Sequence, residues 1–468
     1  MKQRRTTSAR MESASTKDPA PKLWKHQQQT LSLHKHTPIV YDTSDPGTGK
    51  TRVALQAWWS RRKEGGLKAL VIAPKSLLTS AWLNDARMYI PNAKVVLAPT
   101  EHKSDFGLHA DLVITNTDAV KWIVREEPKI LRTFDTLIVD ESTTFKHASS
   151  SRSRAMRKLV RYFKYRNFLT GTPNSNTILD VWHQLFLLDD GVRLGTSFYG
   201  FRGSVCVPEQ NGPMPQHIRW VDREGAEQAV AGLIADICIR HQFDECMDIP
   251  PNFTHRIEVE LPNRLMQMYK RLENDSILTL ENTEVVGVNA AVLANKLLQV
   301  ASGAVYGVDG VVNLDSNRNE LVMDLIEERR HSIVFFNWVH QRNSLTALAE
   351  QRGLSYAFID GTVTGSERTT IVSEYQKGAY QVLFLHPKTG AHGLTLTKGT
   401  ATIWISPIYE ADFLKQGQHR IWRGGQTKKT ETILIQAKNT IEEHVYDRLN
   451  QKTKRMTDLL EMIKCSRH

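Results

Sequence analysis

The sequence has no long hydrophobic run and only a few cysteines. No apolar stretch approaches the roughly 18 residues that a membrane-spanning helix needs, and the N-terminus lacks the apolar core of a signal peptide. The cysteines Cys206, Cys238, Cys246 and Cys465 form no C-x-x-C pair and have no paired His nearby, so neither a disulfide framework nor a zinc site is expected. We therefore expect an intracellular, cytoplasmic protein with buried or incidental thiols.

Acidic residues are scarce at both ends of the chain. Residues 1–36 contain eight Lys or Arg against two acids, and residues 415–468 contain twelve against six, while the whole chain has a formal charge of +11. Positive charge gathered at the ends is typical of a protein that binds a polyanion, because neutralised phosphates release counterions. Residues 1–20 have too little apolar content to join a core and are expected to form a disordered basic tail, either solvated or bound to a polyanion.

The remaining residues alternate short apolar runs with longer helical stretches, in two blocks. A chain of 468 residues exceeds the usual size of one hydrophobic core, so two or three domains are expected. Strands separated by helices predict a parallel sheet in each block, and hence an α/β fold. The expected strands are Ala69–Ala73, Leu112–Thr115, Thr136–Val139 and Asn167–Thr170 in the first block, and Ser332–Phe336, Tyr356–Ile359, Val382–Leu385, Thr402–Ile405 and Thr432–Ile435 in the second.

A helical region is expected between the blocks. Strand signals fade after about residue 176, and helical periodicity runs through Ile178–Leu188, Ala226–His241, Arg264–Leu280 and Val285–Val300. Pro250 and Pro251 break it, because proline restricts itself and the residue before it. We expect an N-terminal domain over residues 21–250 with a helical extension from about 178. A C-terminal domain over 251–468 follows, with a helical segment over 262–303 and a closing helix over 441–463.

The segment Tyr41–Thr51 has the pattern of a P-loop. It lies between an apolar run of strand type and a helix start, and its glycines allow backbone N–H groups to approach phosphate oxygens. Lys50 would add charge at the β- and γ-phosphates, and Thr51 could ligate Mg²⁺. The usual pattern has a glycine where this chain has Ser44. The alternative is a Gly-rich turn that only caps a helix.

Two further segments follow apolar strands of the first block. Asp140 and Glu141 end the strand Leu137–Val139, so Asp140 could hold Mg²⁺ and Glu141 could orient or deprotonate an attacking water, although solvated loop acids are the alternative. The small hydroxyl residues of Leu169–Pro173 could sense the γ-phosphate, or form an ordinary turn.

The second block contains two arginines three residues apart, Arg420 and Arg423, which share one face if the segment is helical. Their planar, permanently charged guanidinium groups suit the stabilisation of a transferring phosphoryl group, and a nucleic-acid contact is equally compatible. An acid-free basic run follows Asp140 and could contact phosphates or form a solvated or partner-facing helix. It comprises Arg152, Arg154, Arg157, Lys158, Arg161, Lys164 and Arg166.

Taken in order, these segments resemble the Swi/Snf-type branch of helicase superfamily 2, compact phage- or prophage-encoded members included. The resemblance spans residues 21 to about 455. It is carried by Leu23–Gln27, Ser44–Thr51, Ala73–Leu77 with Trp82, Asp140–Thr143 with Lys146, Leu169–Pro173, Arg240–Pro251, Val334–Trp338, Asp360-Gly361 with Arg368, Ala391–Thr397 and Gln416–Gln426. It implies two RecA-like parallel-sheet domains of the P-loop NTPase class, with helical insertions between them, in a bacterial or phage-infected host cell.

The resemblance also implies the ligands and their residues, namely ATP and Mg²⁺ between the lobes and DNA across both. The implied catalytic residues are Lys50, Asp140, Glu141, Arg420 and Arg423, with Thr51 and Asp140 for Mg²⁺ and Thr170, Gly171 and Thr172 for coupling. The implied ATP-binding residues are Gln27, Asp45, Pro46, Gly47, Thr48, Gly49, Lys50, Thr51, Gly393 and Gln416. The implied DNA-binding residues are Lys75, Ser76, Thr115, Asn116, Lys146, Asn337, Trp338 and Trp404.

The function expected from this set is an ATP-dependent motor that moves on DNA, duplex or forked, without sequence specificity, in replication, recombination or repair. A strand-separating or annealing helicase is one alternative, and a nucleotide-gated DNA scaffold with little turnover is another. RNA as the track is not excluded by the sequence, because phosphate contacts carry no base information.

Overall fold

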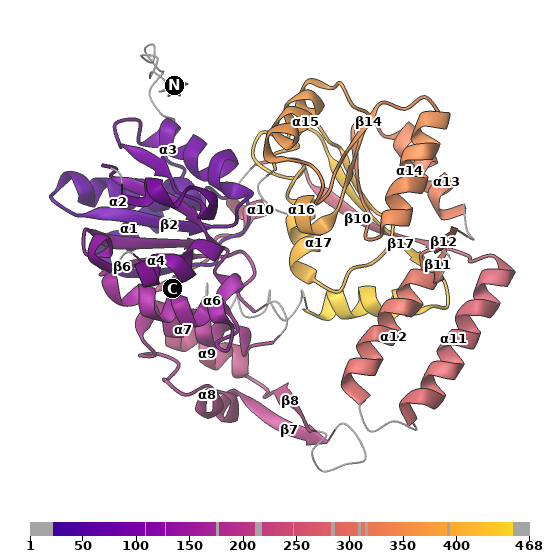
Figure 1. Ribbon diagram of the computed structural model, residues 1–468, viewed down its shortest axis with the longest axis horizontal. Helices are drawn as coiled ribbons and strands as arrows, with labels where there is room; N and C mark the ends of the chain where they lie inside the picture. Colours follow the sequence, from indigo (N-terminus) through magenta and orange to yellow (C-terminus); the bar gives the residue numbers. More distant parts are fainter. Residues whose placement is uncertain are drawn as a thin grey trace, which may run out of the picture.

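The computed structural model describes residues 22–107, 109–126, 128–174, 177–210, 218–246, 248–281, 286–307, 310–313, 317–390 and 394–452. The chain forms two lobes that lie side by side, the first coloured indigo to magenta and the second orange to yellow (Figure 1), each built around its own parallel sheet. The predicted boundary at Pro250-Pro251 lies between the last strand of the first sheet and the first strand in sequence of the second.

The first sheet has the strand order β3-β4-β2-β5-β6-β1-β9, and every pairing in it is parallel. Parallel strands need helical crossovers, which here cover both faces. The strands are β1 (Ile39–Asp42), β2 (Lys68–Ala73), β3 (Val95–Leu97), β4 (Leu112–Asn116), β5 (Phe134–Asp140), β6 (Tyr165–Leu169) and β9 (Cys238–Ile239). The helices are α1 (Lys25–His36), α2 (Lys50–Lys63), α3 (Asn84–Tyr89), α4 (Val120–Glu126), α5 (Pro128–Leu131), α6 (Ser151–Leu159), α7 (Asp180–Asp189), α8 (Phe198–Val205), α9 (Ala226–Ile234) and α10 (Phe243–Cys246).

Short helical turns and one hairpin complete the first lobe. A π-helical turn spans η1 (Leu78–Leu83), and 3-10 turns span η2 (Thr100–Gly107), η3 (Thr117–Ala119), η4 (Ser142–Phe145) and η5 (Val160–Tyr162). The antiparallel hairpin is formed by β7 (Cys206–Gln210) and β8 (Ile218–Asp222).

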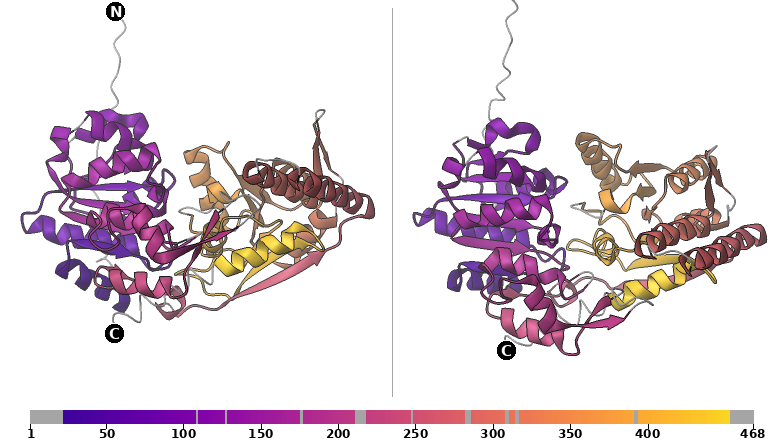
Figure 2. Two further views of the ribbon diagram at one scale, coloured as in Figure 1. Left: turned by 90° about the horizontal axis from the view of Figure 1, so that it is seen from below. Right: turned by 60° about the horizontal axis from the view of Figure 1, so that its bottom comes forward.

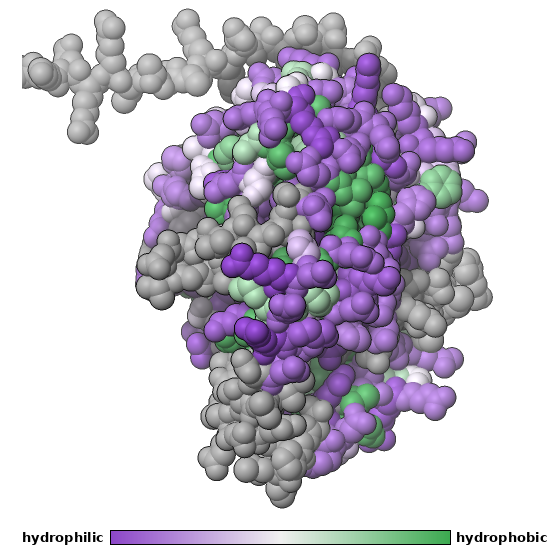
Figure 3. Space-filling view, turned by 90° about the vertical axis from the view of Figure 1, so that its right-hand side faces the viewer, coloured by the Kyte–Doolittle hydropathy of each residue, from purple (hydrophilic) through white to green (hydrophobic). Residues whose placement is uncertain are grey.

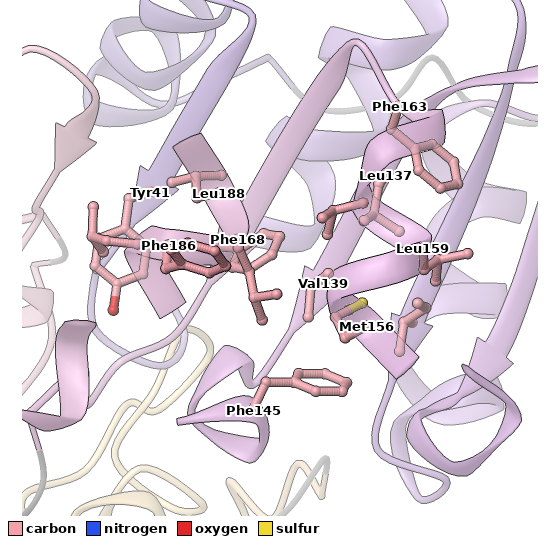
Figure 4. Close-up of a cluster of buried hydrophobic side chains, with 14 of the residues drawn as sticks. Tyr41, Leu137, Val139, Phe145, Met156, Leu159, Phe163, Phe168, Phe186 and Leu188 are labelled. Carbon is pink, nitrogen blue, oxygen red and sulfur yellow. The ribbon is translucent and has the colours of Figure 1, made fainter. Parts of the chain in front are cut away.

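Alternate residues of the central strand β5 point to opposite faces of the first sheet. Leu137 and Val139 lie in a cluster with Met156 and Leu159 of α6 (Figure 4), whereas Ile138 faces a second cluster against α2 and η1. Both clusters are fully buried, so the carboxyl ends of β1 and β5 are held rigidly at one edge of the sheet.

The second sheet has the order β10-β17-β16-β13-β15-β14 and is also parallel throughout. Its strands are β10 (Asn252–Val259), β13 (Ser332–Phe335), β14 (Tyr356–Ile359), β15 (Val382–Leu385), β16 (Ala401–Trp404) and β17 (Thr430–Ala437). A separate hairpin joins β11 (Ala304–Gly307) and β12 (Gly310–Asn313). The helices are α11 (Asn263–Glu281), α12 (Val286–Ala301), α13 (Asn317–Glu328), α14 (Val339–Gln351), α15 (Gly365–Lys377), α16 (Pro387–Gly390), α17 (Ala411–Gln418) and a helix over residues 441–452.

Helices cover both faces of the second sheet as well. Helices α13 and α14 pack their apolar sides on one face. The side of the molecule on which α11, α13 and α14 lie is mostly hydrophilic, with a few hydrophobic patches (Figure 3). Helices α15 and α17 and the helix over 441–452 pack on the other face. Helices α11 and α12 project from the second lobe on the side away from the first (Figure 2). None of the helices in the described part of the chain is long and apolar enough to span a bilayer.

All nine strands expected from the sequence are confirmed, with ends within two residues of the predicted ones. The expectation that strands fade after residue 176 is wrong, because β7, β8, β9 and β10 lie there. The helix expected over Ala226–His241 ends at Ile234, and Cys238 and Ile239 instead pair with Tyr41 and Asp42 of β1. That pairing joins residues far apart in sequence, so no local pattern reveals it.

Three other expectations fall partly or wholly on residues outside the described ones. The basic tail over residues 1–20 and Gly393 are not among the described residues, and the closing helix expected over 441–463 is described as far as residue 452. Of the cysteines, Cys206 and Cys238 are buried, Cys246 is half-buried and none of these three forms a disulfide, while Cys465 is outside the described residues.

Candidate active site

The loop between β1 and α2 requires glycine at two positions. Gly47 has φ +90° and Gly49 has φ +86°, a backbone region that L side chains rarely adopt. A Cβ at Gly49 would lie 2.2 Å from Nε2 of Gln27, and one at Gly47 would lie 2.9 Å from Cε2 of Phe243. Ser44 is not in this left-handed region, so serine can stand where the usual pattern has a glycine.

The loop closes around the amino group of Lys50. Its Nζ donates to the carbonyl oxygens of Ser44 and Asp45, the latter at 3.0 Å. Nε2 of Gln27 donates to the carbonyl oxygen of Thr48 at 3.1 Å, which ties α1 to the loop. Thr51 lies in the first turn of α2, where backbone N–H groups and the helix dipole favour an anion.

Asp140 and Glu141 stand at the carboxyl end of β5. Oδ2 of Asp140 accepts from Nε1 of Trp82 at 2.8 Å, and Oδ1 accepts from the backbone N–H of Glu141 at 3.1 Å. Glu141 has φ +51°, an uncommon conformation for a residue with a side chain. Burial, and then the charge of Asp140, raise the pKa of Glu141 to about 8 against the opposing effect of Lys50.

The second lobe contributes α17 and the residues after it. Nε2 of Gln416 donates to Oε1 of Glu141 at 3.4 Å, which is a direct contact between the lobes. The Nη1 groups of Arg420 and Arg423 donate to the carbonyl oxygen of Leu394 at 2.9 and 3.2 Å. Burial and the neighbouring Arg423 lower the pKa of Arg420 to about 9, with Glu141 opposing the shift.

Arg423 faces the phosphate loop directly. Its Cβ lies 3.5 Å from the point where a Cβ on Gly47 would stand. The structure therefore brings Lys50, Glu141, Gln416, Arg420 and Arg423 together where the two lobes meet, at the place where the sequence predicts the nucleotide cleft.

Asp45 is held differently from the ATP contact expected of it. Its Oδ1 lies 2.8 Å from Nη2 of Arg240 and 2.7 Å from Nζ of Lys415 on α17, and its Oδ2 accepts from the N–H of Phe243. Burial alone would raise the pKa of Asp45, but Lys415 and Arg240 outweigh it, so the pKa lies well below its ordinary value. The carboxylate of Asp45 thus links the phosphate loop to the second lobe, while the backbone carbonyl oxygen of Asp45 accepts a hydrogen bond from Lys50.

The coupling residues pack against the phosphate loop. The N–H of Thr172 donates to Oγ1 of Thr170 at 3.1 Å, and a Cβ on Gly171 would lie 3.0 Å from Cδ of Pro46. The hydroxyl of Thr172 is buried without a hydrogen-bond partner among the described residues. A buried orphan hydroxyl beside a phosphate loop is available for a phosphate oxygen or its water.

The residues present fit Mg-ATP. The glycines leave room that a Cβ would fill, and Oε1 of Gln416 is a second buried polar atom without a partner among the described residues. Those residues contain no group of three or more His, Cys, Asp or Glu side chains suited to a metal. Mg²⁺ is commonly held by one or two protein oxygens together with substrate phosphates, and Thr51 and Asp140 are the residues that would offer such oxygens.

Three residues of the first lobe that are expected to bind DNA have partners within the protein. Thr115 is fully buried and its hydroxyl donates to the carbonyl oxygen of Ala98, and Oδ1 of Asn116 accepts from Thr100. Lys146 forms an ion pair with Asp180 at 3.1 Å. These three side chains have partners within the first lobe in this structure, and their contact with DNA stays a prediction.

In the second lobe, Trp404 is buried, whereas Asn337 and Trp338 are half-buried. Trp404 is 1% exposed and stacks on Phe335 with ring centroids 4.1 Å apart, because its position on β16 points into the core. Nδ2 of Asn337 donates to the carbonyl oxygen of Pro407 at 2.8 Å, and Trp338 is the N-cap residue of α14. Of the expected DNA-binding residues, Lys75 is exposed and paired with Glu101, and Ser76 is half-buried.

Sequence reasoning missed an aromatic contact between the lobes. Phe243 of α10 packs edge-on against His419 and Trp422, with ring centroids 5.4 Å apart in each case. Nε1 of Trp422 donates to the carbonyl oxygen of Pro250. His419 and Trp422 lie within the arginine-bearing segment, but nothing local pointed to Phe243 as their partner.

Comparison with known proteins gives a family for this arrangement. Residues 16–302 match the SNF2-related domain, and residues 317–425 match the helicase conserved C-terminal domain. Protein p41 of Acyrthosiphon pisum secondary endosymbiont phage 1, whose name states no function, is 27% identical over 89% of this chain and 93% of its own length. YwqA of Bacillus subtilis, provisionally named an ATP-dependent helicase/translocase, is 26% identical over 87% of this chain.

The match covers 45% of YwqA, so this chain spans less than half of that relative. The solved Sulfolobus solfataricus SWI2/SNF2 ATPase core in complex with double-stranded DNA is 20% identical and covers 94% of this chain and 93% of its own, with a TM-score of 0.44. Since the SNF2-related match alone covers more than half of the residues, this chain belongs to the SNF2-related family and carries its helicase C-terminal domain.

Proposed function

We propose that this protein is an ATP-dependent motor that couples hydrolysis of Mg-ATP to movement along duplex DNA, in DNA replication, recombination or repair. The observation that carries the proposal is the split site. The phosphate loop and Glu141 of the first lobe meet Gln416, Arg420 and Arg423 of the second in one cleft. Membership of the SNF2-related family also supports an ATP-dependent motor.

Each side chain suits a separate part of phosphoryl transfer. Mg-ATP supplies the phosphoanhydride bond that is cleaved. Lys50 binds the β- and γ-phosphate oxygens as a point charge, and Thr51 and Asp140 provide oxygen ligands for the metal. Glu141 orients the attacking water through its carboxylate, and Arg423 faces the loop from the other lobe as the stabilising cation.

Closure of the lobes completes the site. Gln416 and Arg423 belong to the second lobe, so they reach Glu141 and Gly47 only when the lobes are together. A ligand that binds the closed arrangement more tightly than the open one shifts the protein toward it. DNA bound across both lobes therefore speeds hydrolysis, and the resulting change in lobe position moves the protein along its track.

The contacts proposed for DNA are phosphate contacts. Lys75 and Ser76 follow the carboxyl end of β2, at the edge of the sheet that also carries the phosphate loop, and Lys75 is well exposed. Contacts to phosphates fix position on the duplex without reading bases, so sequence-independent binding is proposed.

Phosphate release with and without DNA tests the proposal. The wild type should show DNA-stimulated release, and Lys50→Ala should abolish both ATP binding and hydrolysis because the phosphate charge loses its partner. Lys63→Ala is the matched control, since Lys63 lies exposed at the other end of α2. Glu141→Gln should bind ATP without turning it over. Absence of any DNA-stimulated turnover in the wild type would favour a nucleotide-gated scaffold and refute the motor.

One panel of nucleic acids identifies the track. Hydrolysis is measured with single-stranded DNA, duplex DNA, forked DNA and RNA in parallel, together with strand release from a forked duplex. Translocation on duplex DNA predicts the greatest stimulation by duplex and no release of a free strand. Stimulation chiefly by RNA, or ATP-dependent strand release, would replace the duplex motor with an RNA motor or a strand-separating helicase.

A further inference from the structure

A groove on the first lobe lies between α4 and α6, which pack side by side (Figure 1), and encloses about 780 Å³. It is outside the cleft between the lobes, since its lining contains none of the residues placed there. Five cations line it, namely Lys121 and Arg125 from α4 and Arg154, Lys158 and Arg161 from α6 and η5.

The groove is basic because of the spacing of its residues. Lys121 and Arg125 are four residues apart on α4, and Arg154, Lys158 and Arg161 follow at i, i+4 and i+7, so each set shares one helix face. All five are exposed, while Tyr162 at the end of the groove is half-buried. Among the described residues that line the groove, none is acidic.

Three of the other four members of the acid-free run have structural contacts instead. Arg152 pairs with Asp118 at 2.6 Å, and the guanidinium of Arg157 lies 4.8 Å from the ring centroid of Phe186. Arg166 is buried and pairs with Asp190 at 2.8 Å. The run is therefore not one uniformly solvated face, because three of its cations are directed together into a single groove with two cations from another helix.

Lys121, Arg154, Lys158 and Arg161 alone place four like charges in one groove, where they repel one another, and a polyanion relieves this repulsion. Along a helix that rises about 1.5 Å per residue, Arg154, Lys158 and Arg161 are spaced by roughly 4.5 to 6 Å, comparable with one to two steps of a nucleic-acid strand at about 3.4 Å each. A nucleic-acid backbone offers such regular charge over any length, whereas an acidic peptide would also need an apolar anchor. Of the residues that line this groove, Val124 and Ala155 are the two with wholly apolar side chains, and both are small.

We infer that the groove between α4 and α6 is a second nucleic-acid site that binds the phosphate backbone of DNA outside the cleft between the lobes. This inference rests on the proposed function, since the DNA held here is the track of the motor or another segment of it. The site adds affinity and keeps the protein on DNA while the cleft opens, but it takes no part in hydrolysis.

The test compares two triple variants that lose the same charge. The groove variant is Arg154→Gln, Lys158→Gln and Arg161→Gln, and the control variant is Lys63→Gln, Lys94→Gln and Lys164→Gln, three exposed cations of the same lobe outside the groove. Binding of a fluorescein-labelled mixed-sequence duplex is measured by anisotropy over a range of salt concentrations. The thermal midpoint of each variant checks that it is folded.

Loss of three phosphate contacts should make the slope of log K against log salt less negative by about 2 to 3 and lower the affinity at 0.1 M salt on the order of 100-fold. ATP hydrolysis without DNA should stay at the wild-type rate, and the DNA concentration for half-maximal stimulation should rise by a similar factor. The control variant should change each quantity much less.

Equal slopes for the groove and control variants would overturn the inference and leave the proposed function intact, because wild-type hydrolysis would still respond to DNA. A wild type that neither binds DNA nor responds to it would refute both. If the groove variant does not fold, the single charge reversal Lys158→Glu provides the same comparison against Lys164→Glu.

Discussion

A buried ion pair in the second lobe should control its stability far more than the surface ion pairs do. Arg318, at the start of α13, and Glu442, in the helix over 441–452, have side chains 1% and 0% exposed. Their two N–H···O contacts measure 3.0 and 2.9 Å. Arg318 also donates to the carbonyl oxygens of Ala301 and Ile405, and Glu442 accepts from the N–H of Ala437. The pair thus links α13 and the helix over 441–452 to α12, to β17 and to the residue that follows β16.

The expected magnitude follows from what each substitution leaves behind. Arg318→Met leaves the carboxylate of Glu442 buried without its guanidinium partner, and breaking such a pair costs about 3 to 5 kcal/mol. Glu442→Gln leaves a buried guanidinium that still has two carbonyl acceptors, so its cost should be smaller. Arg318→Met combined with Glu442→Gln leaves no buried charge. The double variant should therefore be less destabilised than the two single costs added together.

Differential scanning calorimetry measures the effect, with the transition of the second lobe followed separately from that of the first. For a domain of this size, a loss of about 3 to 5 kcal/mol lowers the midpoint by roughly 6 to 20 °C. The control is Arg352→Met, because Arg352 pairs with Glu320, Asp324 and Glu327 at the surface between α13 and α14 and should give a much smaller shift. Additive single and double effects, or a larger shift for Arg352→Met, would refute the reasoning.

Three further predictions concern the cleft. Arg423→Ala should bind ATP normally but turn it over on the order of 10³-fold more slowly, the scale of an arginine finger, and an unchanged rate in a phosphate-release assay would remove Arg423 from the active site. Folding raises the pKa of Glu141 from 4.5 to about 8, so between these pH values Glu141 keeps a proton in the folded protein that it has lost in the unfolded chain. The stability that protonated Glu141 contributes is therefore lost as the pH rises from about 4.5 to 8. The thermal midpoint of nucleotide-free Glu141→Gln should fall less over that range than that of the wild type, and equal falls would contradict the assignment. Lys415→Met should loosen lobe closure because Asp45 loses its partner in the second lobe, and X-ray scattering should show a larger radius of gyration. Lys438→Met is the control and should leave the radius unchanged, because Lys438 pairs with Glu260 at the surface of the second lobe.

The sequence by itself determined the strands and the phosphate loop, because both depend on local patterns. Runs of apolar residues bounded by turns identified nine strands, since a buried parallel strand is apolar on both faces. The glycines at 47 and 49 identified the loop, since its backbone needs φ values that other residues avoid. The resemblance of the ordered segments to the Swi/Snf-type branch was confirmed by the SNF2-related and helicase C-terminal matches.

Only the tertiary structure decided which polar and aromatic side chains are available. Trp404 and Thr115 look like surface contacts in the sequence, but the helices packed over their sheets bury them. Asp45 looks like a nucleotide contact, yet Arg240 and Lys415 hold it in an ion pair with both lobes. The basic run after β5 left phosphate contact and solvation equally open, and the packing of α6 against α4 separated its groove-facing cations from its structural ones. Such contacts depend on residues distant in the chain, so they cannot be predicted from the local sequence.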